Sequence, residues 1–275
     1  MSSHVYLVLT LIFYAVGAIH VVLQFLTRRR LLTNWTVIPT LIGFALHTAA
    51  LAQRWTEAGH FPAVGLHDGA SLLAWTLMLV FLIIHTYSRT PLEVLGLAVY
   101  PLAFALVLIA NLTPAVPVGD PVLRGLFLPI HTTLAFFGYA ALFVAFAVGV
   151  MYLIQERELK SRAPRTFYHL IPSLERCDTL SARAAEVGFA LLTLAIITGL
   201  LWSHAVHGRY WTSSPKEWSA VLAWALYVVL ILVRQRTGWG GRRAALLGIA
   251  AFAAVAFTFV WMNVSTAASV SARTP

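Results

Sequence analysis

Residues 199–219 read Gly-Leu-Leu-Trp-Ser-His-Ala-Val-His-Gly-Arg-Tyr-Trp-Thr-Ser-Ser-Pro-Lys-Glu-Trp-Ser, and this stretch indicates how the chain is built. An apolar segment that we expect to be helical leads into a short loop, and another apolar segment follows the Pro-Lys-Glu-Trp turn. Two histidines and several aromatic residues gather there, at the edge of an expected membrane helix. Aromatic faces and imidazoles in such a place suit a flat, metal-bearing ligand better than an ion or a sugar.

Outward from this loop, apolar segments follow one another along nearly the whole chain. Apolar residues make up 60% of the 275 residues and charged residues only 11%, whereas soluble domains carry about 25% charged residues. A membrane-spanning helix needs about 20 mostly apolar residues. We therefore predict an all-α fold, a polytopic membrane bundle of eight transmembrane helices. The predicted spans are 4–26, 35–53, 67–87, 92–112, 127–154, 182–206, 218–235 and 244–264.

The basic residues predict how the bundle is oriented. Fourteen of the 19 Lys and Arg residues lie in or beside the loops after the first, third, fifth and seventh spans. Cytoplasmic loops carry an excess of Lys and Arg, so we expect the N-terminus and C-terminus outside the cytoplasm, together with the loop 207–217. The net charge of +9 then reflects orientation in the lipid bilayer of a bacterial inner membrane, and no nucleic-acid partner is expected. The single cysteine, Cys177, excludes an internal disulfide and a paired-thiol site.

Most of the histidines fall on the predicted outer half of the bundle. They are His4, His47, His60, His67, His131, His204 and His207. Neutral imidazole is a good axial ligand for haem iron, and ionisable residues within spans usually face the bundle interior. His131 and His47 have apolar neighbours, which favours a ligand role, although an interhelical hydrogen bond is the alternative for His47. For a loop residue such as His207, the alternative is simple exposure to water.

The aromatic residues of the loop also have two interpretations. Tyr210, Trp211 and Trp218 could form a platform on which a flat ligand stacks. Trp and Tyr are, however, enriched at the interfaces of every membrane protein, so they could instead form an ordinary interfacial belt with Trp202 and Trp224.

Three further segments, in a fixed order around this loop, carry a family resemblance. Leu-Pro-Ile-His-Thr-Thr-Leu-Ala-Phe-Phe-Gly begins at Leu128, Ile-Pro-Ser-Leu-Glu-Arg-Cys-Asp-Thr-Leu begins at Ile171, and Gly-Trp-Gly-Gly-Arg-Arg begins at Gly238. Together they resemble the cytochrome c assembly protein family, which includes CcsA, CcmC and HemX-type proteins. The resemblance covers about 127–264, and the size and eight spans resemble HemX-type or YpjD-type members most. It implies an N-terminal four-helix half, 1–126, and a cytochrome c assembly-like core, 127–275.

The family's loop has the form Trp-Gly-x-Tyr-Trp-x-Trp-Asp-Pro-Lys-Glu-Thr-Trp, and here it is degenerate. The chain keeps Gly, Tyr-Trp and Pro-Lys-Glu, but His207 replaces the first Trp and Ser213-Ser214 replaces the Trp-Asp pair. His131 matches the first of the family's haem-ligating histidines. Two further family histidines have no counterpart, since no histidine follows His207.

The resemblance implies a non-catalytic or weakly catalytic protein that binds or presents haem at the extracytoplasmic face for cytochrome c biogenesis. The haem would be of b type and bound non-covalently, and other cytochrome c assembly proteins would be partners. Tyr210, Trp211 and Trp218 would stack on the porphyrin, and Arg209 or Lys216 would pair with its propionates. His131 would be the axial ligand, paired with His204, His207 or His47; His131 and His204 are the first choice of metal ligands.

The lost histidines and the lost Trp-Asp pair support an alternative class of function. In that alternative the chain is a haem-free membrane scaffold, or a regulator of haem biosynthesis or of an assembly complex. A small-molecule transporter is a third reading, but the sequence shows neither repeated halves nor clearly broken helices.

Overall fold

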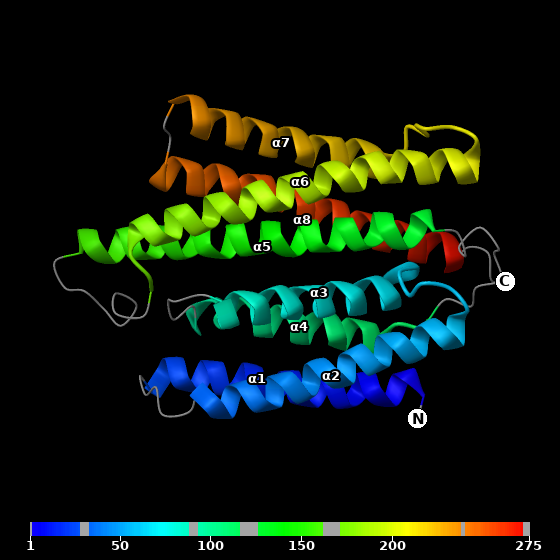
Figure 1. Cartoon of the computed structure of the whole chain (residues 1–275), viewed down its shortest axis with the longest axis horizontal. Coiled ribbons are helices and arrows are strands. Elements are labelled where there is room, and N and C mark those ends of the chain that lie inside the picture. Colours follow the sequence, from blue (N-terminus) through cyan, green and yellow to red (C-terminus); the bar gives the residue numbers. More distant parts are fainter. Residues whose placement is uncertain are drawn as a thin grey trace. The chain divides into compact units, whose positions relative to one another are not determined.

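The computed structural model describes residues 2–27, 33–87, 93–115, 126–161, 171–237 and 240–271, with the side chains of 33–36, 93, 216, 237 and 258–271 left out of the description. These residues form eight α-helices and no strand, which confirms the all-α prediction (Figure 1). The helices are α1 (Ser3–Thr27), α2 (Thr33–Ala58), α3 (Gly65–Tyr87), α4 (Glu93–Leu112), α5 (Phe127–Lys160), α6 (Leu174–His207), α7 (Pro215–Thr237) and α8 (Gly241–Ser271).

Most of these helices have the length and composition of membrane spans. Within the described residues, α1, α3, α4, α5, α6 and α7 each contain a window apolar enough to cross a bilayer, whereas α2 and α8 are not among these six. Each of the eight helices overlaps one of the predicted spans, and the six apolar ones make the chain a multi-pass membrane protein in its architecture.

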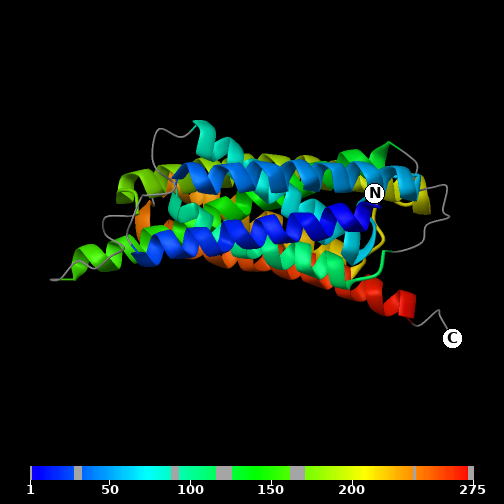
Figure 2. The same cartoon turned by 90° about the horizontal axis from the view of Figure 1, so that it is seen from below.

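The chain divides into two compact units near residue 130. Unit 1 contains α1 to α4, and unit 2 contains α5 from Ile130 onward with α6, α7 and α8 as far as Val264. In unit 1, α1 and α2 run side by side, and α4 packs on both α1 and α3 (Figures 1 and 2). Gly17 makes room for the ring of Tyr100, because a Cβ at Gly17 would lie 2.5 Å from that ring.

Buried polar side chains tie the helices of unit 1 together. His47 is fully buried, and its Nδ1 and Nε2 form hydrogen bonds with the Tyr14 hydroxyl at 3.2 Å and the Ser71 hydroxyl at 3.1 Å. The Thr40 and Tyr100 hydroxyls form a second buried pair. Hydrogen bonds of this kind hold helices together in a medium that offers no water as a partner. The surroundings of His47 are thus those of an interhelical hydrogen bond, the alternative given above for this residue.

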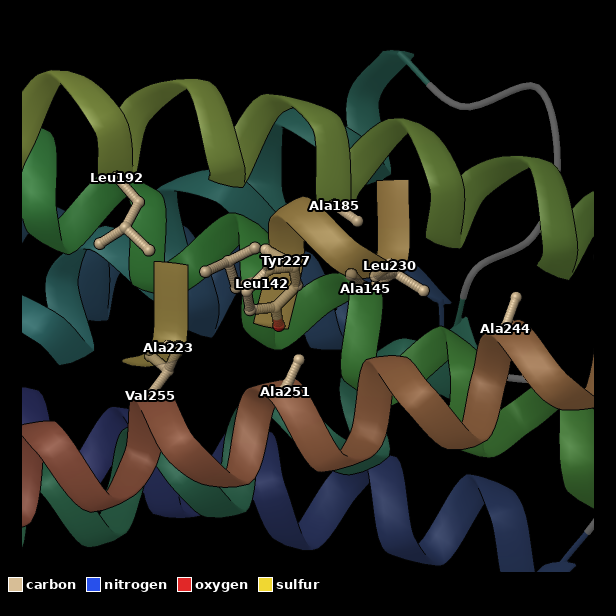
Figure 3. Close-up of a cluster of buried hydrophobic side chains, with 10 residues drawn as sticks. All are labelled: Leu142, Ala145, Ala185, Leu192, Ala223, Tyr227, Leu230, Ala244, Ala251 and Val255. Atoms are coloured by element: carbon tan, nitrogen blue, oxygen red, sulfur yellow. The ribbon is translucent and has the colours of Figure 1, made fainter. Parts of the chain in front are cut away.

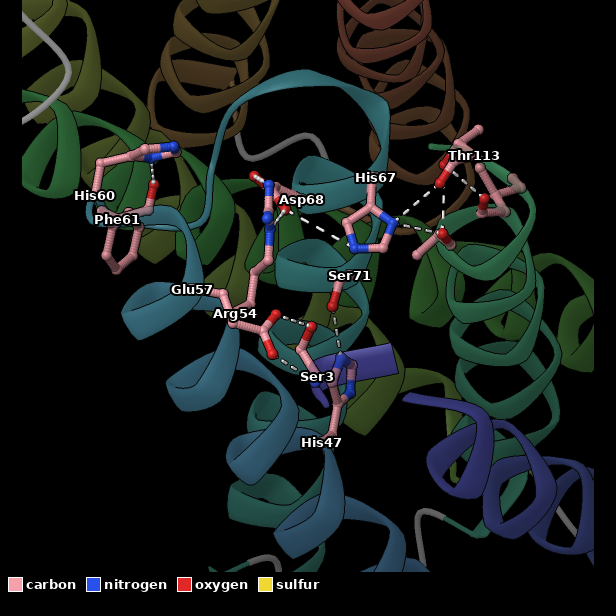
Figure 4. Close-up of polar contacts among 12 residues, drawn as sticks. Ser3, His47, Arg54, Glu57, His60, Phe61, His67, Asp68, Ser71 and Thr113 are labelled. Carbon is pink, nitrogen blue, oxygen red and sulfur yellow. Dashed lines mark hydrogen bonds and ion pairs between the residues drawn. The ribbon is translucent and has the colours of Figure 1, made fainter. Parts of the chain in front are cut away.

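An ion pair joins α2 to α3 at the end of unit 1 where α1 begins (Figure 4). Arg54 Nε lies 2.9 Å from Asp68 Oδ1, and the Asp68 side chain is fully buried. Beside it, His67 Nδ1 donates to the carbonyl oxygens of Ala110 at 2.7 Å and Thr113 at 3.1 Å, which fixes the end of α4. Removing one partner of a buried ion pair leaves the other charge uncompensated.

Unit 2 is held by a core in which small residues allow close helix packing (Figure 3). The core residues are Leu142, Ala145, Ala185, Leu192, Ala223, Tyr227, Leu230, Ala244, Ala251 and Val255, from all four helices of the unit. A Cβ at Gly188 would lie 2.5 Å from the Leu142 side chain and 3.1 Å from its backbone nitrogen, so glycine at this position favours the close approach of α6 to α5.

The Asp178 carboxylate links three helices of unit 2 at the end where α6 begins. Asp178 Oδ2 accepts from Arg234 at 2.6 Å, and Asp178 Oδ1 accepts from the backbone N–H of Gly241 at 2.8 Å. These bonds bring the segments that begin at Ile171 and at Gly238 into contact, and they connect the start of α6 with the end of α7 and the start of α8.

The ion pair of unit 1 gives the first testable prediction. We expect Asp68→Asn to destabilise the protein by about 3 kcal/mol, because Arg54 then lacks its buried counter-charge. Glu57→Gln is the control: Glu57 is exposed and bonded to Ser3 at the same end of the unit, so a change of no more than about 0.5 kcal/mol is expected. Thermal unfolding in detergent compares the two, and equal effects would contradict this assignment.

Candidate functional site

A pocket opens in unit 2 between the start of α5, the end of α6 and the start of α7. Its volume is about 330 Å³, within the range of small-molecule sites. Its walls are mainly apolar and aromatic, with a few polar groups. The lining residues are His131, Ile196, Gly199, Leu200, Trp202, Ser203, His207, Trp211, Thr212, Ser214, Glu217, Ala220 and Val221.

His131 is held in one tautomer and one orientation by α6. Its Nδ1–H donates to the carbonyl oxygen of Ala195 at 2.7 Å, and in the neutral tautomer that this bond favours the lone pair is on Nε2. Gly199, one turn further along α6, makes room for the ring: a Cβ there would lie 2.8 Å from His131 Cε1. Metal-ligating histidines are commonly held by this type of Nδ1–H···O=C bond.

Trp202 forms part of the pocket wall and is a ring neighbour of two histidines. Its indole is parallel to the His131 imidazole, with ring centroids 6.5 Å apart, and meets the His207 imidazole edge-on at 6.4 Å. The Trp202 Nε1 is buried and has no hydrogen-bond partner in the described part of the chain. A buried N–H without a partner is costly, so a bound ligand that accepts from it would improve the site.

The loop after α6 is folded back by its own backbone contacts. Gly208 adopts a left-handed conformation with φ 66°, and its N–H donates to the His204 carbonyl at 2.9 Å. Ser203 Oγ then donates to the carbonyl oxygen of Arg209 at 2.9 Å. Tyr210 stacks on His204 with centroids 4.2 Å apart. His204 is not among the residues that line the pocket.

Glu217 fastens the rest of the loop to the start of α7. Ser214 N donates to Glu217 Oε2 at 3.2 Å, while Glu217 N donates to Ser214 Oγ at 3.4 Å. This is a capping box with Pro215 at the first helical position. The same carboxylate accepts from the backbone N–H of Thr212 at 3.0 Å and from its hydroxyl at 2.8 Å.

These contacts explain one departure from the family's loop. Ser214 stands where the family has Asp, and both residues cap helix N-termini well, so the start of α7 keeps its capping side chain. Ser213 stands where the family has Trp, and its φ of 58° is a left-handed conformation in which a bulky residue is an outlier. The backbone therefore suits the serines present here.

The predicted site residues are only partly brought together. His131, His207 and Trp211 line the pocket, and Trp218 meets Trp211 edge-on at 5.4 Å. Tyr210 and Trp218 are exposed.

Of the remaining predicted residues, some do not line the pocket, and the side chain of one is not among those that the structure describes. The Arg209 side chain is exposed on the loop, and the Lys216 side chain lies outside the described residues. His47 belongs to unit 1.

The sequence analysis did not identify the residues of α6 that hold the His131 ring. Ala195, Gly199 and Trp202 follow a spacing of four and then three residues along α6, which places them on one helix face. That spacing is the signal that could have revealed Gly199 and assigned Trp202 to the site instead of to an interfacial belt.

Glu217→Ala tests whether the carboxylate orders the loop. We expect backbone amides of 212–217 to exchange faster, because the bond from Ser214 N to the Glu217 carboxylate, which is half of the capping box, and the two bonds from Thr212 are lost. Hydrogen–deuterium exchange measures this. Glu175→Ala, which alters the first turn of α6 at that helix's other end, is the control and should leave the loop unchanged. Unchanged exchange in both variants would contradict the role of Glu217.

Known proteins are similar in sequence to most of this chain. A cytochrome c biogenesis protein CcsA from Synechococcus sp. (strain CC9902) is 30% identical over 256 residues, which cover 82% of this chain and 83% of the relative. A cytochrome c biogenesis protein CcsA from Prochlorococcus marinus (strain MIT 9303) is 30% identical over 264 residues, covering 84% and 82%.

The family model described as cytochrome C assembly protein matches residues 64–267. The match includes every residue that lines the pocket, and it begins well before residue 127, where the resemblance predicted from the sequence starts. The segments that begin at Leu128, Ile171 and Gly238 all lie within it. The chain belongs to the cytochrome c assembly protein family.

Proposed function

We propose that this protein binds haem in the pocket of unit 2, at the extracytoplasmic face of a bacterial cytoplasmic membrane, and presents it for cytochrome c biogenesis. The observation that carries the proposal is the way His131 is held, by its hydrogen bond to the Ala195 carbonyl and in the space left by Gly199. With the Nδ1–H of this imidazole donated to the Ala195 carbonyl, Nε2 is the ring nitrogen that would bind iron.

The pocket fits a flat aromatic cargo in three respects. Indole rings of Trp202 and Trp211 form part of its wall and can stack on a porphyrin. The buried N–H of Trp202 offers a donor that has no partner within the described residues. Trp218, which is exposed, meets the lining residue Trp211 edge-on and extends the aromatic surface beyond the pocket.

Charge and covalent chemistry define the form in which haem would be bound. Arg209, and Lys216 from the sequence, would pair with the propionates, since cationic donors bind carboxylates well. The only cysteine, Cys177, lies near the start of α6, whereas the pocket lies at the end of that helix. Haem in the pocket would therefore be of b type and bound non-covalently.

Basic residues at the opposite end of unit 2 support the proposed orientation. The last turns of α5 and α7 carry Arg157, Lys160, Arg234 and Arg236, and α8 begins with Arg242 and Arg243. By the excess of basic residues in cytoplasmic loops, this end faces the cytoplasm and the pocket faces outward. All eight helices would then span the membrane, with both termini outside and with residues 127–275 carrying the haem site. Assignment to the HemX-type or YpjD-type members remains part of this proposal.

Haem binding is tested with the purified full-length protein. We expect a Soret band after haemin is added, and His131→Ala should weaken haem affinity by at least about tenfold because the oriented ligand is removed. His4→Ala, at an exposed position of unit 1, is the control and should bind like the native protein. Absorption titrations measure both. A native protein that stays colourless, and co-purifies with a stable partner, would contradict the proposal and favour the haem-free scaffold.

A further inference from the structure

We infer that the Trp202 side chain is a gate, which covers His131 in the observed conformation and turns aside when the cargo binds. The inference rests on the proposed haem-binding function and adds a conformational step to it. The pocket that Trp202 lines has a volume of about 330 Å³, at the lower end of the range for small-molecule sites. A porphyrin is a large flat ligand, so the pocket has to widen to enclose it.

Trp202 is a wall residue with ring contacts to both histidines of the pocket lining. Its indole plane makes an angle of 1° with the His131 imidazole, with ring centroids 6.5 Å apart, and it meets the His207 imidazole edge-on at 6.4 Å. The His131 ring is held in place from α6 by its bond to the Ala195 carbonyl. A parallel indole beside a fixed imidazole limits the directions from which a large flat ligand can approach that imidazole.

No hydrogen bond of the indole N–H holds Trp202 in this orientation. Its Nε1 is buried and has no partner in the described part of the chain, and a buried N–H without an acceptor is less stable than one that is hydrogen-bonded. Neighbouring polar groups of the wall are already engaged. Ser203 Oγ donates to the Arg209 carbonyl. The Glu217 carboxylate accepts from Thr212.

The backbone at Trp202 can stay in place while the side chain turns. Trp202 lies near the end of α6, which is closed by the bond from the Gly208 N–H to the His204 carbonyl. Side chains in helices commonly occupy two χ1 wells, and a change between them swings an indole without breaking a helix hydrogen bond. Trp202 is only partly buried, and its edge-on neighbour His207 is exposed, so the ring is not enclosed by the core of unit 2.

Turning of the indole would change two things at once. The N–H would leave the place in which it lacks a partner and become available to water or to the cargo, which offsets the loss of the ring contacts. The His131 imidazole would lose its parallel neighbour, while its bond to Ala195 would keep it oriented. The site thus combines a movable cover on α6 with a fixed imidazole on α5.

The cover is tested first without haem, through the reactivity of His131. Full-length native protein, Trp202→Ala and Trp211→Ala are treated in detergent with diethylpyrocarbonate, which acylates neutral imidazole, and modification of His131 is followed by mass spectrometry. We expect His131 to react at least about fivefold faster in Trp202→Ala, because it is then accessible in every molecule. Trp211→Ala, which changes another indole of the lining, should react at the native rate. Equal rates in native protein and Trp202→Ala overturn the inference.

The kinetics of haemin association then test whether the cover turns. If turning precedes binding, the observed rate in the native protein levels off as the haemin concentration is raised, whereas in Trp202→Ala it continues to rise. Trp202→Phe keeps an aromatic cover but removes the N–H that lacks a partner. The covered state is then favoured, so the plateau rate should fall about threefold below that of the native protein.

The outcomes separate the gate from the proposed function. A native rate that rises linearly with haemin concentration, with the same slope as in Trp202→Ala, overturns the gate and leaves haem binding intact. A plateau rate in Trp202→Phe that equals or exceeds the native one does the same. A native protein that takes up no haemin overturns the proposed function, and the opening step with it.

Discussion

The hydrogen bond from His131 Nδ1 to the Ala195 carbonyl is the interaction on which the candidate site depends. It crosses from α5 to α6, fixes the tautomer of the ring, and aims the lone pair of Nε2 away from the bond. Gly199 provides the space in which the ring lies. An imidazole among apolar neighbours would otherwise be a structural group of unit 2. With this bond, it is held in one orientation at the edge of a pocket, as the proposed ligand role requires.

The loop between α6 and α7 gives that ligand its surroundings. Gly208 ends α6 with a left-handed turn, and the capping box of Ser214 and Glu217 starts α7. Because both ends of the loop are fixed by local bonds, the aromatic residues between them have a defined position without depending on the family's complete Trp-Asp motif. A change from Asp to Ser at a capping position preserves the local structure, so the degenerate loop is compatible with a working site.

Much of the fold could be predicted from the sequence because apolar length is a direct requirement of the bilayer. Each of the eight helices overlaps one of the predicted spans, and His131, selected from its motif, lines the pocket. The contacts of His131 with Ala195 and Gly199 could not be predicted, since they depend on how α5 and α6 pack. The stacking of Tyr210 on His204, which separates His204 from the pocket lining, depends on the path of the loop after Gly208. Composition and spacing do not encode such long-range geometry.

Gly199→Ala tests the central claim most directly, because it changes the space around His131 without altering any proposed ligand. The new Cβ would lie 2.8 Å from the imidazole, so the ring must move from its bond with Ala195. The measurement is haemin affinity by absorption titration, with Gly248→Ala, whose Cβ would meet only ordinary contacts in unit 2, as the matched control. Affinity should fall by about tenfold in Gly199→Ala and stay unchanged in the control. Equal, native-like affinity in both variants would contradict the account.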